Sequence, residues 1–522
     1  MANRRKVRES GVSLLLGILS LMFIIPMVGL TIDVCILYTV RARLQSAVDG
    51  AALAAARALN LGQTTDSQAA SAKQNAVNWF YANFPTGTWA TTGANMTTAS
   101  VNVFDDPTNS HLRNVTISAS ISAPTYFMQW FGYRAINIAA SGNASRRDVV
   151  VMMVLDVSGS MQNAGVCDDM VAAAKIFTGQ FAAGRDMIGL VTFNQATYIK
   201  SSPVTDFQTR LGYTNSSGSG TGILDTITCS GGTGTAQAIS VGYNELYKVN
   251  LPGALNVLMF ETDGLPNSLT VSQWDNTNRV TGISSSSNCL DINGKKVSQG
   301  GFATLAAQRV WASAPSLGSG SYYTNLPSSV TASIWSADPS ASHIIMPANN
   351  YWEGDAYITT ANGCAFNNNR GSYTGTGDFA WWPLTDIWGN ELSPTNAYKS
   401  VTISGGHVQN SGWTNFHNAA LNAADDAAHN ARINATIPAY FFGIGLGGGT
   451  GDPPDLTLLQ RMTNDPNPDT FSGTNAYRSC AQTTGCVNYP SEPQGTLVYS
   501  TNAAALGRAF LSISSQILRL SK

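Results

Sequence analysis

Charged side chains are scarce in this chain of 522 residues. Asp, Glu, Lys and Arg make up 11% of the sequence, against about 25% in an average soluble domain. The 29 basic and 31 acidic residues give a formal net charge of −2, so nothing indicates a basic surface for nucleic acid. Gly, Ser, Thr, Asn and Ala replace the charged residues, a composition common in bacterial proteins outside the cytoplasm.

Motifs of the common enzyme classes are also missing. The chain contains no GxSxG, HExxH or GxxxxGKS/T, the motifs of serine hydrolases, zinc proteases and P-loop nucleotide-binding proteins. The five histidines are scattered and no two cysteines form CxxC, which excludes the usual spacings of a structural zinc site. We therefore expect no enzyme and assign no catalytic residue.

A long apolar segment lies near the N-terminus. Residues 11–30 are apolar apart from two serines and follow the basic run at residues 4–8. About 20 apolar residues are enough to span a bilayer. A cleaved signal peptide is the alternative, but the segment is long and no small-residue cleavage site follows it directly. We expect a retained single-pass anchor in the inner membrane, with the N-terminus cytoplasmic and the bulk of the chain periplasmic or surface-exposed.

An alanine-rich segment continues from this anchor. It contains TIDVCILY (31–38) and LQSAVDGAALAAARAL (44–59). Residues 11–59 resemble the N-terminal segment of TadE/TadG-like proteins of the Flp (tight adherence) pilus system. A generic alanine-rich stalk would explain the alanines but not the ordered Asp, Leu and Gln residues. The resemblance implies an envelope component of pilus assembly, and the absence of an evident prepilin processing site favours the anchored, TadG-like branch.

Residues 61–147 are predicted to form a small α+β module after the anchor and stalk at residues 1–60. We expect a helix over 67–84, strands over 100–104, 114–123 and 135–140, and a short aromatic helix over 126–131. The second strand alternates apolar and polar residues (VTISASISA), the pattern of a strand with one buried face. The module shows no chemistry of its own.

A buried strand followed by oxygen-bearing side chains comes next. Residues 149–155 are apolar without a break and lead into Asp156, Ser158 and Ser160. An unbroken apolar run suits a parallel strand covered on both faces, and ligands of open α/β sheets bind at the carboxyl ends of such strands. Carboxylate and hydroxyl oxygens suit Mg²⁺ or Mn²⁺ better than zinc. Alternatively, the same residues only cap the next helix.

Two later segments favour the metal site. Residues 230–235 (SGGTGT) place Thr233 behind a glycine pair and ahead of a helical stretch. Residues 254–260 form a second apolar strand, which leads into Thr262, Asp263 and Gly264. DxSxS, GGTxT and TDG in this order resemble the metal-ion-dependent adhesion site (MIDAS) of von Willebrand factor A (VWA) domains.

That resemblance implies a ligand set, a cofactor and a kind of partner. The metal would be Mg²⁺, with Mn²⁺ or Ca²⁺ possible, and an acidic side chain of a protein partner would complete its coordination. The implied ligands come from three loops: Asp156, Ser158, Ser160, Thr233 and Asp263.

The six cysteines that follow Cys35 are expected to form disulfides in an oxidising compartment. The VWA resemblance places Cys167 after the first metal loop and Cys229 before the second, so we expect the fold to bring them together. Two further pairs are then hypothesised, Cys480–Cys486 as a short local loop and Cys289–Cys364 within an insertion.

The predicted fold class is α/β: a transmembrane helix, a stalk and a small α+β module precede a Rossmann-like VWA domain at residues 148–522. Residues 265–412 lack helical periodicity and are too long for a loop in a compact domain, so we expect an inserted subdomain that interrupts the VWA fold. Its tryptophans suit either a buried core, which we favour, or a binding face.

Three functions remain open. The first is a membrane-anchored, divalent-metal-dependent binding or adhesion protein that acts with other Flp/Tad pilus or envelope components. The second is an envelope scaffold with a vestigial metal site. A hydrolase within the insertion is the least favoured.

Overall fold

The computed structural model divides the chain into two compact units, Met1–Arg147 together with Lys522, and Asp148–Ser521. This division coincides with the predicted start of the VWA portion at residue 148. The residues that the structure describes are 5–62, 64–194, 197–213, 221–266, 268–271, 301–304, 309–313, 351–353, 381–382, 384–386, 388–404, 407–409, 413–447, 453–466 and 489–521.

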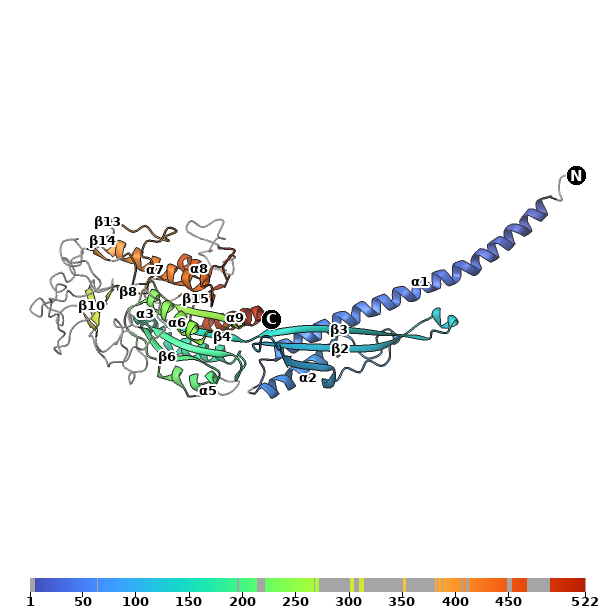
Figure 1. The fold of residues 1–522 in the computed structure, drawn as a ribbon, viewed down its shortest axis with the longest axis horizontal. Helices are drawn as coiled ribbons and strands as arrows, with labels where there is room; N and C mark the ends of the chain where they lie inside the picture. Colours follow the sequence, from blue (N-terminus) through green and yellow to red (C-terminus); the bar gives the residue numbers. More distant parts are fainter. Residues whose placement is uncertain are drawn as a thin grey trace, which may run out of the picture. The chain divides into compact units, whose positions relative to one another are not determined.

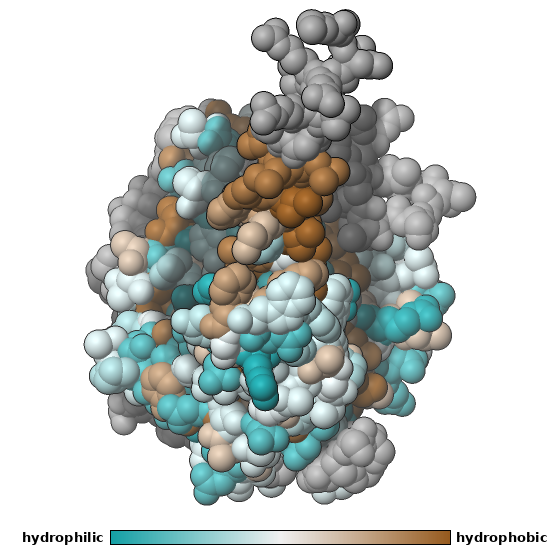
Figure 2. Space-filling view, turned by 90° about the vertical axis from the view of Figure 1, so that its right-hand side faces the viewer, coloured by the Kyte–Doolittle hydropathy of each residue, from teal (hydrophilic) through white to brown (hydrophobic). Residues whose placement is uncertain are grey.

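The first unit begins with a single long helix, α1 (Arg5–Ala58). Among the described residues it is the one helix that is long and apolar enough to cross a membrane. Most of its apolar side chains between Leu14 and Val34 are exposed, Met22 by 73% and Phe23 by 68%. Figure 2 shows this apolar surface in brown. Exposure of such residues to water would be unfavourable, so this part of the helix fits membrane anchoring.

The second half of α1 belongs to a folded core. Val40, Leu44, Val48 and Ala55 are buried against α2 and a three-stranded antiparallel sheet. The predicted division between a stalk at residues 1–60 and a module at 61–147 therefore does not separate two bodies, because both contribute to one core. The other elements of this core are α2 (Thr65–Asn83), β1 (Val101–Asp105), β2 (Leu112–Pro124) and β3 (Ala135–Arg147).

The strand β3 is longer than predicted. Its second half, SGNASRR, has no apolar alternation, yet it pairs with β2 from Ser141↔Ser118 to Arg147↔Leu112. The short aromatic helix is the 3₁₀-helix η3 (Met128–Phe131), between β2 and β3. Two further short 3₁₀-helices, η1 (Thr88–Ala90) and η2 (Thr98–Ser100), precede β1.

The second unit is built on a six-stranded sheet with strand order β16-β15-β7-β4-β5-β6. Neighbouring strands are parallel, except that β6 is antiparallel to β5. Every residue of β4 and β7 is buried, as expected for central parallel strands. In sheet order the bounds are Leu497–Ser500, Tyr440–Leu446, Leu255–Thr262, Val149–Asp156, Met187–Phe193 and Thr197–Val204.

Helices cover both faces of this sheet (Figure 1). Alternate residues of β4 divide between two cores: Val150, Met152 and Val154 face one, and Val151 and Met153 the other. The first core contains α6 (Thr235–Val249), α7 (Trp413–Ile433) and α8 (Leu456–Thr463). The second contains α4 (Cys167–Thr178), α5 (Phe207–Leu211) and α9 (Ala503–Leu520). The layered arrangement confirms the α/β class.

Two local features of this unit were not predicted. The helix α4 ends at Thr178. A side chain at Gly179 would meet the ring of Tyr213 at 2.3 Å, so the chain turns there against that ring. The strand β16 was not expected, because four residues are too few to give a periodic pattern.

Strands of separate sheets lie in the predicted insertion. Strands β8 (Ser268–Val271), β9 (Gly301–Thr304), β10 (Arg309–Ser313) and β11 (Tyr351–Glu353) form a four-stranded antiparallel sheet. Strands β12 (Trp381–Trp382), β13 (Ile403–Ser404) and β14 (His407–Gln409) form another. Trp388 is 4% exposed and belongs to the first core, as expected for a core tryptophan. The hypothesised pairs Cys289–Cys364 and Cys480–Cys486 lie outside the described residues.

Candidate metal centre

Three loops meet where the central strands β4 and β7 end. These two strands are parallel neighbours, with Leu155 paired to Glu261, so their last residues lie at the same edge of the sheet. Asp156 is the last residue of β4, Ser158 directly precedes the short helix α3 (Gly159–Asn163), and Ser160 lies in the first turn of that helix. Asp263 directly follows β7. The sheet therefore brings together residues that are about a hundred positions apart in the chain.

A chain of hydrogen bonds joins the first loop to the third. The Ser160 hydroxyl donates to Asp263 Oδ1 at 2.6 Å, and Ser158 Oγ lies 2.8 Å from Ser160 Oγ. Because the one proton of Ser160 points to Asp263, Ser158 is the donor in that pair. The backbone N–H of Ser158 donates to Asp156 Oδ1 at 2.8 Å, which closes the first loop on itself.

The second loop lies against the first. Gly159 N–H donates to the Gly231 carbonyl at 2.8 Å, and Ser230 N–H donates to the Val157 carbonyl at 2.7 Å. A side chain on Gly159 would meet the Gly231 carbonyl at 3.1 Å, so the absence of a side chain permits this approach. A Cβ placed on Gly264 would be 3.6 Å from Ser160 Oγ and 4.0 Å from Thr233 Oγ1. All five predicted residues thus gather at one place.

Two supports of the second loop come from outside the motifs. Asn194, directly after β5, donates from its side-chain Nδ2 to the Ser230 carbonyl at 2.8 Å, and its backbone carbonyl accepts the Gly234 N–H at 2.7 Å. The disulfide Cys167–Cys229 joins the start of α4 to the residue before Ser230. This pair confirms the predicted disulfide. Asn194 was missed, because an isolated Asn after a strand carries no motif.

Two more polar residues, neither of which was predicted as a ligand, lie at the end of β7. Thr262 Oγ1 donates to Asp156 Oδ2 at 2.5 Å, so Thr262 fixes that carboxylate from the neighbouring strand. Glu261 is fully buried, and neither of its carboxylate oxygens has a hydrogen-bond partner. In the sequence, the one feature that could have pointed to Glu261 as part of the site is its position as an acidic residue at the end of a largely apolar strand.

The site concentrates acidic groups in a buried place. Burial, and then the nearby Asp263, raise the pKa of Asp156 to about 7. Burial also raises the pKa of Asp263. The pKa of Glu261 lies well above its usual value, first through burial and then through Asp156 and Asp263. Ionised carboxylates in such a place are costly unless a positive charge accompanies them.

The donor set fits a hard divalent cation. Asp263 Oδ2 is buried and has no hydrogen-bond partner, which leaves one carboxylate oxygen of the site without a proton donor. The remaining donors are a second carboxylate and hydroxyls, the oxygen ligands that Mg²⁺ and Mn²⁺ prefer. In the part of the chain that the structure describes, no group of three or more His, Cys, Asp or Glu side chains could hold a metal ion, so the candidate rests on two carboxylates together with hydroxyls.

Family models match both units. Residues 11–58 match the model described as putative Flp pilus-assembly TadE/G-like. Residues 151–265 match the von Willebrand factor type A domain, which covers all three loops of the site. The chain carries a TadE/G-like segment and a VWA domain. These two matches support a pilus-related role in assembly or adhesion.

Solved structures of pilus proteins are similar at low identity. The PilB minor pilin of Streptococcus sanguinis is 12% identical, with 81% of this chain and 78% of that chain covered and a TM-score of 0.31. The vWF domain of the type V pili tip protein Mfa5 of Porphyromonas gingivalis is 16% identical, with 73% and 98% covered and a TM-score of 0.31. The pilus adhesin SpaC of Lactobacillus rhamnosus GG is 13% identical, with 81% and 35% covered and a TM-score of 0.32. Such low TM-scores carry no argument about function. No curated protein matches the chain.

Proposed function

We propose that this protein is a membrane-anchored binding protein of a Flp/Tad-type pilus system whose VWA domain binds a partner in a divalent-metal-dependent way. The observation that carries the proposal is the hydrogen-bonded chain Ser158–Ser160–Asp263, because the second oxygen of the Asp263 carboxylate, Oδ2, is buried and has no proton donor. The TadE/G-like match at residues 11–58 supports the pilus system.

The residues of the site have separate tasks in this proposal. Asp156, Ser158, Ser160, Thr233 and Asp263 hold Mg²⁺, or Mn²⁺ or Ca²⁺ in its place. When bound, the cation supplies positive charge to which an acidic side chain of the partner binds more strongly than a neutral one. Thr262 and the Ser158 N–H orient the Asp156 carboxylate, and Asn194 with the Cys167–Cys229 disulfide keeps Thr233 beside the first loop.

The proposed protein binds and does not catalyse a reaction. Among the described residues, the carboxylates and hydroxyls of the first and third loops form hydrogen bonds with one another and with backbone groups, and none of these bonds involves a histidine or a lysine. A nucleophile would need such a base beside it. The proposed place is the inner membrane, with the N-terminus cytoplasmic and the VWA domain on the other side, where disulfides persist.

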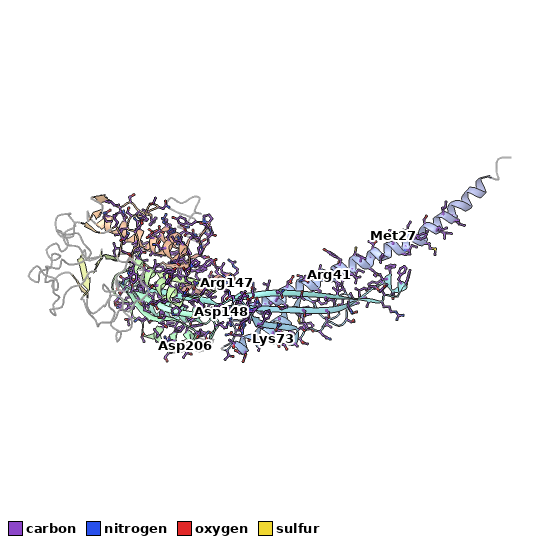
Figure 3. All side chains as sticks on the ribbon, viewed as in Figure 1. Met27, Arg41, Lys73, Arg147, Asp148 and Asp206 are labelled. Carbon is purple, nitrogen blue, oxygen red and sulfur yellow. A yellow bond between two sulfur atoms is a disulfide. The ribbon has the colours of Figure 1, made fainter. Side chains whose placement is uncertain are left out.

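The experiment that tests this function compares cells that express Asp263→Asn with cells that express the wild type. The substitution keeps the shape and the acceptor for the Ser160 hydroxyl, and it removes the charge. We expect pilus-dependent adhesion to fall to the level of a deletion strain, with equal amounts of protein in the membrane. Asp206→Asn is the matched control, because Asp206 is exposed at the start of α5 and is labelled in Figure 3.

Wild-type adhesion in the Asp263→Asn cells would contradict the proposal. The scaffold hypothesis would then take its place, because assembly through the anchor and the first unit does not need a charged VWA site. A loss of adhesion in the Asp206→Asn cells as well would also contradict it, since a general defect would explain both variants.

A further inference from the structure

An exposed aromatic cluster lies at the tip of the β2–β3 hairpin. Tyr126, Trp130, Phe131 and Tyr133 are exposed by 49%, 70%, 65% and 58%. Isolated exposed aromatic residues are ordinary in folded proteins, but four within eight consecutive residues form an apolar surface that needs an occupant. Neither the VWA site nor the core of the first unit uses these side chains.

The tip is fastened to α1 by one buried carboxylate. Asp33 is 1% exposed and accepts the backbone N–H groups of Tyr126, Phe127 and Met128 at 2.9, 2.8 and 2.6 Å. These N–H groups lead into η3 and have no helical acceptor, so Asp33 satisfies them from another element. The contact fixes the position of the hairpin tip along α1, about 95 residues away in sequence.

A second contact joins the hairpin tip to the same part of α1. A side chain on Gly29 would meet the ring of Phe127 at 2.4 Å, so this ring packs directly on the backbone of α1. Phe127 in turn contacts Trp130 edge-on, with their ring centroids 6.0 Å apart. Figure 1 shows the hairpin alongside α1, and Figure 3 labels two residues of α1, Met27 near the hairpin tip and Arg41 farther from it.

The hairpin tip contacts α1 at the place where the apolar part of the helix ends. At a rise of about 1.5 Å per residue, the twenty residues from Leu14 to Asp33 extend about 30 Å, the thickness of a bilayer's hydrocarbon core. Asp33 is the first charged residue after the apolar segment. The aromatic cluster therefore lies where a membrane-spanning α1 leaves the hydrocarbon, and Arg134 directly follows it with an exposed side chain.

We propose that the β2–β3 tip is a lipid-binding foot: Trp130, Phe131, Tyr126 and Tyr133 insert into the headgroup region of the outer leaflet of the same membrane that α1 spans, with Arg134 at the phosphates. Tryptophan and tyrosine are enriched at this depth because their rings suit the boundary between acyl chains and water. The foot and α1 together hold the first unit at two points on the membrane. The inference rests on α1 as an anchor and is independent of the metal site.

The test measures the depth of the tip in a bilayer of known composition. Full-length protein with Cys35→Ser is reconstituted into vesicles of phosphatidylethanolamine and phosphatidylglycerol. A polarity-sensitive fluorophore is attached at Gln129→Cys, an exposed position within the tip that leaves the four aromatic residues intact. The control carries the fluorophore at Phe104→Cys, also exposed, on β1 opposite Asn114. Asn114 is about 33 Å along β2 from Pro124, the last residue before the tip.

We expect the fluorescence at position 129 to shift to shorter wavelength and to be quenched several-fold more strongly than at position 104 by lipids with nitroxides on the headgroup or high on the acyl chain. Adding Trp130→Ser and Phe131→Ser should remove most of that difference. Equal quenching at both positions would overturn the proposal. So would quenching that survives the double substitution, because the helix alone would then explain the depth. A blue shift that occurs only in native envelope membranes would also overturn it, in favour of a protein partner.

Discussion

Ser160 and Asp263 are 103 residues apart in the chain, and the Ser160 hydroxyl donates a hydrogen bond to Asp263 Oδ1 at 2.6 Å. This contact joins the turn after β4 to the turn after β7. It exists because both strands are parallel and central, so their carboxyl ends meet at one edge of the sheet. The relationship between these two residues is the basis for the proposed metal centre.

The first prediction concerns the Ser160 hydroxyl. Ser160→Ala removes both a proposed ligand and the donor to Asp263, so we expect Mn²⁺ affinity to fall by about 10-fold or more. Titration of the detergent-solubilised full chain by calorimetry measures it. Ser512→Ala, on the exposed side of α9, is the control and should bind as the wild type does. Unchanged affinity in Ser160→Ala would remove Ser160 from the ligand set.

The second prediction concerns pH. The pKa of Asp156 is raised to about 7 by burial and by Asp263, so the carboxyl group holds a proton below that pH in the metal-free protein. Metal binding must displace this proton. We therefore expect Mn²⁺ affinity to rise between pH 5.5 and 7.5, by up to roughly tenfold per pH unit, and to level off above this range. An affinity that falls with rising pH would contradict the assignment.

The same shift affects stability with the opposite sign. A carboxyl group with a raised pKa in the folded state binds more protons there than in the unfolded state, so stability decreases as pH rises from the unfolded pKa of about 4 toward 7. In a chelating buffer, the melting temperature of the wild type should fall across this range. The fall should be smaller in Asp156→Asn. If the melting temperature rose equally in both proteins, burial of the charged Asp156 carboxylate would not lower the stability of the folded state.

The third prediction concerns the disulfide Cys167–Cys229. It closes a segment with a sequence separation of 62 and ends close to the second loop. Replacing both cysteines by alanine should lower the free energy of unfolding by about 2–4 kcal/mol, measured by chemical denaturation. We also expect weaker Mn²⁺ binding, because Thr233 follows Cys229 by four positions. Wild-type metal affinity without the disulfide would show that Asn194 and the glycine contacts suffice to hold the loop.

The sequence predicted the centre of the second unit better than its edges. Strand β4 is apolar without a break up to Asp156, and β7 is apolar from Val257 to Phe260, so the ends of both strands and the oxygen ligands after them could be predicted. The contacts of Asn194 and Thr262 could not be predicted, because each joins segments that are distant in sequence. Strand β16 is too short to carry a period.

In the first unit the limits were different. The role of the first half of α1 as an anchor was predicted, but the packing of its second half in a folded core was not. Val48 and Ala55 contact a sheet that begins more than forty residues later, and alanines alone do not indicate what covers them. Asp33 was noted as part of the Tad-like pattern, whereas its role as acceptor for three N–H groups depends on a turn at residues 126–128.

The fourth prediction concerns Asp33. Asp33→Ala leaves the N–H groups of Tyr126, Phe127 and Met128 without their acceptor, at a cost of about 1–3 kcal/mol for each hydrogen bond to a charged group. Deuterium exchange at residues 126–131 should become roughly tenfold faster or more, since 1.4 kcal/mol corresponds to a factor of ten. Asp66→Ala, at an exposed position in the first turn of α2, is the control. Equal exchange in all three proteins would mean that Asp33 does not hold the tip.

The most direct test of the account is a calorimetric titration of Mn²⁺ into the metal-free full chain, repeated with Asp263→Asn and Asp206→Asn. The account predicts saturable binding of one ion by the wild type and by Asp206→Asn, and no measurable binding by Asp263→Asn, with all three proteins folded by circular dichroism. Equal Mn²⁺ affinity in the wild type and Asp263→Asn would contradict it.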